Sequence, residues 1–131
     1  MDGQRLQFGA LSLGNPHFVM EVDDVDQAPL ATLGPRLETH ADFPQRVNVG
    51  FMQRLSSTRL RLRVHERGVG ETLACGSGAC AAMAVARLWE RTGSQVQVEV
   101  RGGTLSIQWA GEDQPIWLTG PATRVFKGEL T

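Results

Sequence analysis

The sequence predicts a single α+β domain in which a largely antiparallel sheet surrounds a central helix. The chain has 131 residues, of which 41% are hydrophobic and 21% are charged, so it can form one packed core but is short for two domains. Segments of alternating apolar and polar residues, separated by short turns, predict seven or eight strands, and short connections favour antiparallel pairing. An alanine-rich run over 77–91 predicts a helix slim enough to be enclosed by the sheet.

Two strands and a helix are expected in the N-terminal third. The strands cover 6–14 and 17–24 and are joined at a Gly-Asn-Pro turn. Apolar residues alternate in the second segment, as is typical of a half-buried strand. Leucines at spacings of three and four predict a helix over 26–40. Pro29 suits the first turn of this helix, whereas Pro35 should kink or break it.

A hairpin is expected in the middle of the chain, with strands 46–55 and 58–67 joined at two serines. In its second strand, apolar residues alternate with Arg59, Arg61 and Arg63, so one face is apolar and the other cationic. We favour a solvated strand face, because interleaved aromatic residues typical of RNA-binding surfaces are missing. An RNA- or ligand-binding module that uses this face remains the non-enzymatic alternative.

The C-terminal third is predicted to hold the alanine-rich helix 77–91, ended by Gly93. Three short strands should follow it, with glycine-containing turns between them, near 95–101, 104–110 and 114–119. The segment 123–130 closes the chain.

Composition argues against several classes of function. The formal net charge of −1 gives no general attraction to nucleic acid or to anionic membranes. Lys127 is the only lysine, so Schiff-base and pyridoxal chemistry are poorly supported. The sequence has no apolar run of roughly 18 residues that could span a bilayer and no secretory signal at its start, so we expect a cytoplasmic protein.

The two cysteines differ in their surroundings. Cys75 directly precedes the predicted helix, and Gly76 and Gly78 would let a ligand approach the unpaired N–H groups there. A carboxylate could bind the backbone of Gly76 and Ser77 while a thiolate of lowered pKa faces the neighbouring carbon. Taken alone, this stretch favours a buried structural cysteine. Cys80 reads as a core residue, about 7.5 Å of helical rise away, so we expect neither a disulfide nor a zinc site.

Further polar residues indicate a functional site only when they are considered together. "HERGVGET" places Glu66 and Arg67 in a glycine-rich turn before the cysteine, and an arginine can bind a carboxylate through two hydrogen bonds. "GNPHF" offers Asn15 and His17 at a turn, and "RVNVGF" offers Asn48 among apolar neighbours, where its amide must find partners. Each of these residues alone could be structural.

Together, "GNPH", "FPQRVNVGF" and "RVHERGVGETLACGSGACA" strongly resemble the C-terminal half of the diaminopimelate epimerases, the pyridoxal-independent epimerases of bacterial lysine and peptidoglycan biosynthesis. The resemblance runs from about Gly14 to the end of the chain. It implies that residues 1–131 form one domain of a two-domain enzyme. In this family each domain is a mostly antiparallel, barrel-like sheet around a central helix, and the active site lies between the domains.

The resemblance implies inversion of one α-carbon of LL-diaminopimelate to give the meso form, without a metal or cofactor. Two cysteines face opposite sides of that carbon, one removing the proton and the other returning one. The implied catalytic residues are Cys75, His17 and Glu66. The implied substrate-binding residues are Asn15, Asn48, Glu66 and Arg67 at the distal end of the substrate, and the backbone of Gly76 and Ser77 at the reacting carboxylate.

The N-terminal domain of the family, with its second cysteine, is absent from this chain, and Cys80 cannot replace that cysteine. We therefore expect the isolated chain to be inactive and to expose an apolar cleft face, through which it could form a homodimer. Another pyridoxal-independent isomerase of the same fold, such as a proline, hydroxyproline or histidine racemase or a phenazine-pathway enzyme, is the enzymatic alternative.

Overall fold

A computed structural model describes residues 8–41, 44, 46–72 and 76–120. The strands are β1 (Phe8–Ser12), β2 (Pro16–Glu21), β3 (Asn48–Ser56), β4 (Arg59–Glu66), β5 (Gly70–Glu71), β6 (Gln95–Val100), β7 (Gly103–Trp109) and β8 (Ile116–Thr119). The helices are a short 3-10 helix η1 (Val25–Gln27), α1 (Leu30–Glu38) and α2 (Gly76–Leu88). The expected final segment 123–130 lies outside the described residues.

All eight strands belong to one sheet, in the order β1-β2-β3-β4-β6-β7-β8, with β5 paired to β4. Five of the seven strand pairs among the described residues are antiparallel, which confirms the prediction of a mostly antiparallel sheet. The pairs β2–β3 and β4–β6 are parallel. Each parallel pair follows a connection that contains a helix, α1 or α2, because parallel neighbours need a long crossover.

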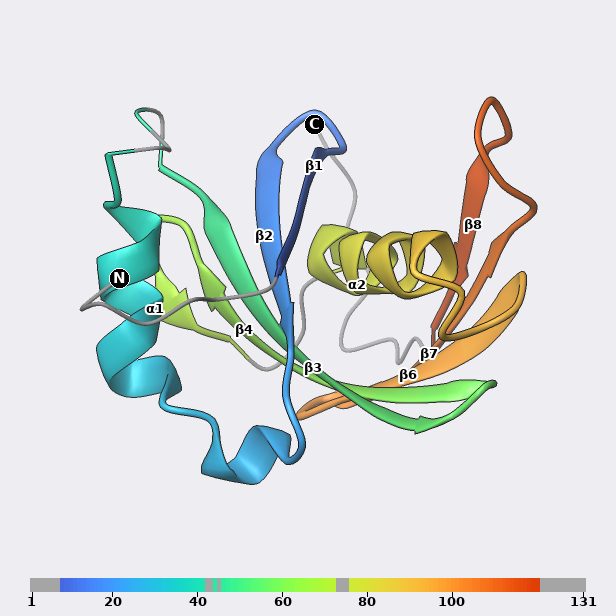
Figure 1. Cartoon of the computed structure of the whole chain (residues 1–131), viewed down its shortest axis with the longest axis horizontal. Helices are drawn as coiled ribbons and strands as arrows, with labels where there is room; N and C mark the ends of the chain where they lie inside the picture. The colour runs from blue at the N-terminus through green and yellow to red at the C-terminus, as the bar shows by residue number, and fades with distance from the viewer. Residues whose placement is uncertain (1–7, 42–43, 45, 73–75, 121–131) are drawn as a thin grey trace, which may run out of the picture.

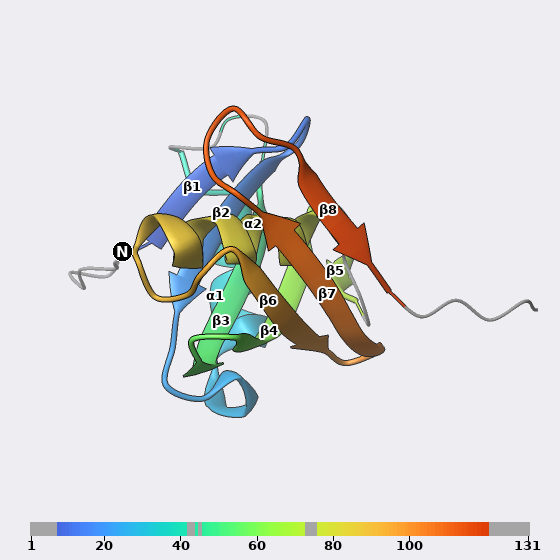
Figure 2. The same ribbon diagram turned by 90° about the vertical axis from the view of Figure 1, so that its right-hand side faces the viewer.

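Helix α2 lies inside the curve of the sheet, with β1 and β2 on one side and β7 and β8 on the other (Figure 1). The view at right angles shows the sheet curling around the helix (Figure 2). Every residue from 78 to 86 is buried. A Cβ atom at Gly9 in β1 would lie 2.6 Å from Cγ2 of Val85, so the sheet approaches the helix as closely as backbone allows. The predicted central, alanine-rich helix is confirmed, although it ends at Leu88 rather than at 91.

The two faces of the sheet bury two separate clusters of apolar side chains. One cluster surrounds α2 and includes Met52 and Leu62. The other lies on the opposite face, where α1 packs (Figure 1), and includes Phe51 and Leu37. Successive residues of β3 thus point to opposite cores, as the pleat of a strand requires.

The break expected at Pro35 does not occur, because α1 runs through this residue from Leu30 to Glu38. The proline removes only one backbone donor, whose helical acceptor would be the carbonyl of Ala31. Ala31 is exposed, so water can satisfy that carbonyl. Pro29 lies just before the helix rather than in its first turn, and its carbonyl accepts a hydrogen bond from the Leu33 N–H at 2.8 Å.

The cationic face of β4 is neutralised by acidic side chains. Its ion pairs are Arg59–Glu99 at 3.0 Å, Arg61–Asp26 at 3.0 Å and Arg63–Glu71 at 2.8 Å. Arg63 also donates to the carbonyl of Val25 in η1 at 3.0 Å. This face therefore anchors neighbouring elements, whereas the sequence predicted only a solvated strand face. The ion pairs disfavour a contact surface for nucleic acid.

Candidate active site at the start of helix α2

The turn between β1 and β2 brings two predicted site residues to the first turn of α2. The side-chain amide of Asn15 donates to Oγ of Ser77 at 3.3 Å. Its Oδ1 lies 3.2 Å from Nε2 of His17. Because a carbonyl oxygen only accepts, this contact places the imidazole proton on Nε2 and leaves the lone pair on Nδ1. Asn15 therefore orients His17 and links it to the helix start.

His17 is 2% exposed, and this burial lowers the pKa of its imidazole. The positive charge of Arg67 lowers this pKa further, whereas Glu66 opposes the shift. His17 is consequently neutral near pH 7. A neutral imidazole with a lone pair on Nδ1 can accept a proton, which is the property that a general base requires.

Asn48 joins the β1–β2 turn to the β4–β5 turn. It is the Cα partner of His17 in the parallel pair of β2 and β3. Its Nδ2 donates to the carbonyl of Pro16 at 3.2 Å, and its Oδ1 accepts from the backbone N–H of Arg67 at 2.7 Å. The expectation that this buried amide must find partners is confirmed.

The turn after β4 presents Glu66 and Arg67 beside this network. Glu66 is the last residue of β4 and pairs with Gly70 of β5. Gly68 and Gly70 adopt φ values of +77° and +100°, which residues with a side chain rarely tolerate. The Val69 N–H closes the turn on the Glu66 carbonyl at 3.1 Å.

Helix α2 begins at Gly76, one residue after Cys75. Cys75 lies outside the described residues, so its assignment rests on the sequence. A Cβ atom at Gly76 would lie 3.2 Å from Cδ2 of Leu118 in β8, so β8 lies close to the helix start. Cys80 is a buried residue inside α2, as predicted.

Two hydrogen-bonded groups thus contain most of the predicted site residues: Asn15 with His17 and Ser77, and Asn48 with the backbone of Arg67. The bond from Asn48 to the carbonyl of Pro16, which lies between Asn15 and His17 in the sequence, links the two groups. The sequence assigned only the backbone of Ser77 to the site, and its bond to Asn15 through the hydroxyl group was not expected. Within the described ranges, no cluster of three or more His, Cys, Asp or Glu could hold a metal ion. Within the same ranges, no helix combines the length and apolar character needed to cross a bilayer.

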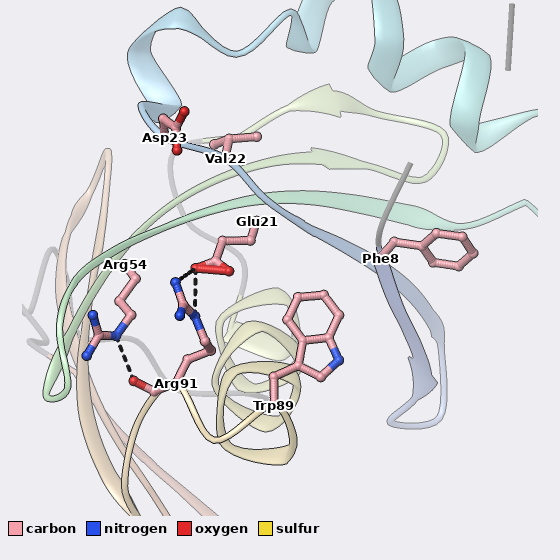
Figure 3. Close-up of a pocket in the computed structure, with 7 residues that line it drawn as sticks. All are labelled: Phe8, Glu21, Val22, Asp23, Arg54, Trp89 and Arg91. Atoms are coloured by element: carbon pink, nitrogen blue, oxygen red, sulfur yellow. Dashed lines mark hydrogen bonds and ion pairs between the residues drawn. The ribbon is translucent and has the colours of Figure 1, made fainter. Parts of the chain in front are cut away.

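A separate open depression of about 1080 Å³ lies near the other end of α2 (Figure 3). Arg91 forms an ion pair with Glu21 at 2.7 Å there, and Nε of Arg54 donates to the Arg91 carbonyl at 2.7 Å. Trp89, which also lines it, follows α2 directly and is about 20 Å of helical rise from Gly76. None of the predicted site residues in the described ranges lines this depression.

Solved structures with a similar fold are phenazine biosynthesis proteins of the PhzF family. The Bacillus anthracis protein matches with a TM-score of 0.58 and 18% sequence identity, covering 86% of this chain and 38% of that chain. The Enterococcus faecalis protein matches with a TM-score of 0.59 and 16% identity, covering 79% and 39%. These matches define the class of fold, a curled α+β sheet around a central helix.

The particular family follows from closer relatives. The family model described as diaminopimelate epimerase matches residues 9–125. Curated diaminopimelate epimerases of Alkalilimnicola ehrlichii and Ectopseudomonas mendocina are 57% and 58% identical over 130 residues, covering 99% of this chain and 47% of each relative. The chain belongs to the diaminopimelate epimerase family, and it spans about half the length of these relatives.

Proposed function

We propose that residues 1–131 form the C-terminal half of a cofactor-independent epimerase that converts LL-diaminopimelate to the meso form. In this proposal Cys75 exchanges a proton with the substrate α-carbon on one side. A second cysteine, in an N-terminal half, acts on the other side. The complete enzyme serves lysine and peptidoglycan precursor synthesis in the cytoplasm, and the isolated chain is inactive.

The observation that carries this proposal is a pair of linked hydrogen-bonded groups around the β1–β2 turn. They join residues from the β1–β2 turn, β3, the β4–β5 turn and α2. Each of these segments contains a residue that the family resemblance assigns to the site. Asn15 brings the network to Ser77, two residues after Cys75, and this contact supports the assignment of Cys75 as the base.

The geometry suits proton transfer at a weakly acidic carbon. N–H groups at the start of α2 would stabilise charge on the reacting carboxylate. His17, neutral at pH 7, would accept the proton of the Cys75 thiol and so supply a thiolate. Glu66 and Arg67, with the help of Asn15 and Asn48, would bind the charged distal end and orient the substrate.

The other candidates receive less support. The identity of the PhzF-family structures is below 20%, so they support the fold but not a phenazine-type reaction. The arginine face of β4 is engaged in ion pairs with Glu99, Asp26 and Glu71, which argues against an RNA-binding function.

A hybrid epimerase tests the proposal. It joins the half of the Alkalilimnicola ehrlichii relative that this chain does not match to residues 1–131. Deuterium incorporation at the α-carbon of diaminopimelate in D₂O should occur with the hybrid and not with the isolated chain.

Cysteine variants of the hybrid provide the matched control. Cys75→Ala should abolish exchange, whereas Cys80→Ala, inside the alanine-rich helix, should retain it within about threefold. A folded hybrid without exchange, or one in which Cys75→Ala remains active, would contradict the proposal.

A further inference from the structure

A buried carboxylate lies behind the β4–β5 turn and is not used in the mechanism above. Glu38, the last residue of α1, is 6% exposed. Its Oε1 lies 2.6 Å from Nε2 of His65 in β4. Its Oε2 accepts from the backbone N–H of Gly68 at 3.1 Å and lies 3.5 Å from Nη1 of Arg46.

Two neighbouring N–H groups of the turn are therefore held by two side chains from different elements. Asn48 of β3 accepts from the N–H of Arg67 at 2.7 Å, and Glu38 of α1 accepts from the N–H of Gly68 at 3.1 Å. Gly68 has φ = +77°, and because glycine has no Cβ atom its backbone can leave this conformation unless outside contacts fix it. The two acceptors supply such contacts on either side of the Arg67–Gly68 peptide bond.

The position of Glu38 is itself fixed by close packing of α1 on β4. A Cβ atom at Gly34, one helical turn earlier, would lie 2.9 Å from Cγ of His65. The imidazole thus lies directly against the backbone of α1, where its Nε2 meets the Glu38 carboxylate. Burial opposes ionisation of Glu38, but the contacts with His65 and the Gly68 N–H outweigh it and hold the pKa of this carboxyl below its usual value.

We propose that Glu38 is a positioning residue that sets the place of Arg67 for the distal end of the substrate. The inference rests on the proposed function, because it assigns a purpose to α1 in that same site. Glu38 touches the backbone of the turn rather than the substrate, so its loss should weaken substrate binding more than the proton-transfer step.

The test uses the hybrid epimerase with three substitutions in α1. Glu38→Ala should raise KM for diaminopimelate about tenfold and lower kcat less than about threefold, as expected for one charge-assisted hydrogen bond. Glu38→Gln retains an oxygen acceptor for the Gly68 N–H and should restore KM to within about threefold. Leu33→Ala, which removes apolar packing from the same helix, controls for general loss of stability and should leave KM unchanged.

A substitution in the turn separates positioning from a structural effect. If Glu38 acts through Arg67, Glu38→Ala should raise KM less than about twofold in an Arg67→Ala background. Amide hydrogen exchange of the 66–70 segment, read by mass spectrometry, should accelerate about tenfold in Glu38→Ala and not in Leu33→Ala.

An active hybrid in which Glu38→Ala changes neither KM nor exchange of this segment would overturn the inference alone. So would an equal rise of KM in the Arg67→Ala background or in Leu33→Ala. A folded hybrid without any α-hydrogen exchange would instead overturn the proposed function, and with it the substrate role of the turn.

Discussion

At the residue scale, His17 shows how burial sets the chemistry of a side chain. In an exposed loop, a histidine would be about half protonated near pH 6.5. Enclosure between β1 and β3, together with Arg67, disfavours the charged form. Asn15 then determines which nitrogen holds the proton, so burial, a neighbouring charge and a hydrogen bond together set the protonation of this side chain.

Replacement of His17 tests this function. In the hybrid epimerase, His17→Gln should lower kcat by about 100-fold or more, the usual contribution of a general base. Because the pKa of His17 is lowered, kcat/KM of the parent should rise with pH along a limb whose midpoint lies below 6.5, and this limb should vanish in the variant. A variant that keeps both the rate and the limb would exclude His17 as the base.

The same pKa shift affects folding. A histidine whose pKa is lower in the folded state favours that state above pH 6.5, and this contribution is lost as the pH falls through the folded value. Acid therefore removes the neutral form of His17 that the proposed mechanism uses and also lowers the stability of the folded state.

The residues that the sequence assigned to the candidate site did not include Glu38. The motifs that carry the family resemblance pointed to the turns, and the structure connects those turns through Asn15 and Asn48. Glu38 belongs to no such motif. The available signal was its place four residues after Gly34 and one after Leu37, on the face of α1 that becomes buried, where an acidic residue needs a partner.

At the element scale, local patterns predicted the helices and strands well but not how two pairs of strands meet. Alternation in β4 and the two serines before it predicted the hairpin within one or two residues at each end. The parallel pairs β2–β3 and β4–β6 depend on where α1 and α2 return the chain, and such crossovers leave no mark in either strand alone. The predicted break at Pro35 was wrong because tertiary packing of α1 outweighs one lost hydrogen bond, and this packing is also not visible in the local sequence.

Helix α1 also allows a direct test of packing against propensity. Gly34→Ala should improve helix propensity by about 1 kcal/mol, yet its methyl group would lie 2.9 Å from Cγ of His65. We expect a net loss of about 1–3 kcal/mol in the free energy of unfolding of the isolated chain, measured with urea. Thr32→Ala on the exposed side of α1 is the control and should change it by less than about 1 kcal/mol. Stabilisation by Gly34→Ala would show that α1 is not held closely against β4.

At the scale of the whole molecule, several exposed apolar side chains lie beside the candidate site. Leu13 is 39% exposed next to the turn that carries Asn15, Val69 is 73% exposed next to Gly68, and Leu118 is 46% exposed near Gly76. In the proposed enzyme the N-terminal half covers this surface. The isolated chain lacks that cover, so contact between two copies would remove apolar area from water.

The predicted homodimer can be tested by sedimentation. The isolated chain should self-associate at micromolar to millimolar concentrations, and the double variant Leu13→Ser, Val69→Ser should shift it towards monomer. A matched double variant far from the site, Leu55→Ser, Leu88→Ser, replaces side chains that are 43% and 55% exposed and should leave the association unchanged. A chain that is monomeric throughout this range would contradict the prediction.

Because the sheet wraps closely around α2, one part of the domain does not tolerate larger side chains and another part does. Ala79, Ala81, Ala82 and Ala86 are fully enclosed, so any larger group there would force strands apart on several sides at once. The turns at 13–15 and 67–69 lie outside that enclosure. A different substrate preference could therefore evolve, or be engineered, through substitutions in these two turns, without any change to the sheet and the helix that it surrounds.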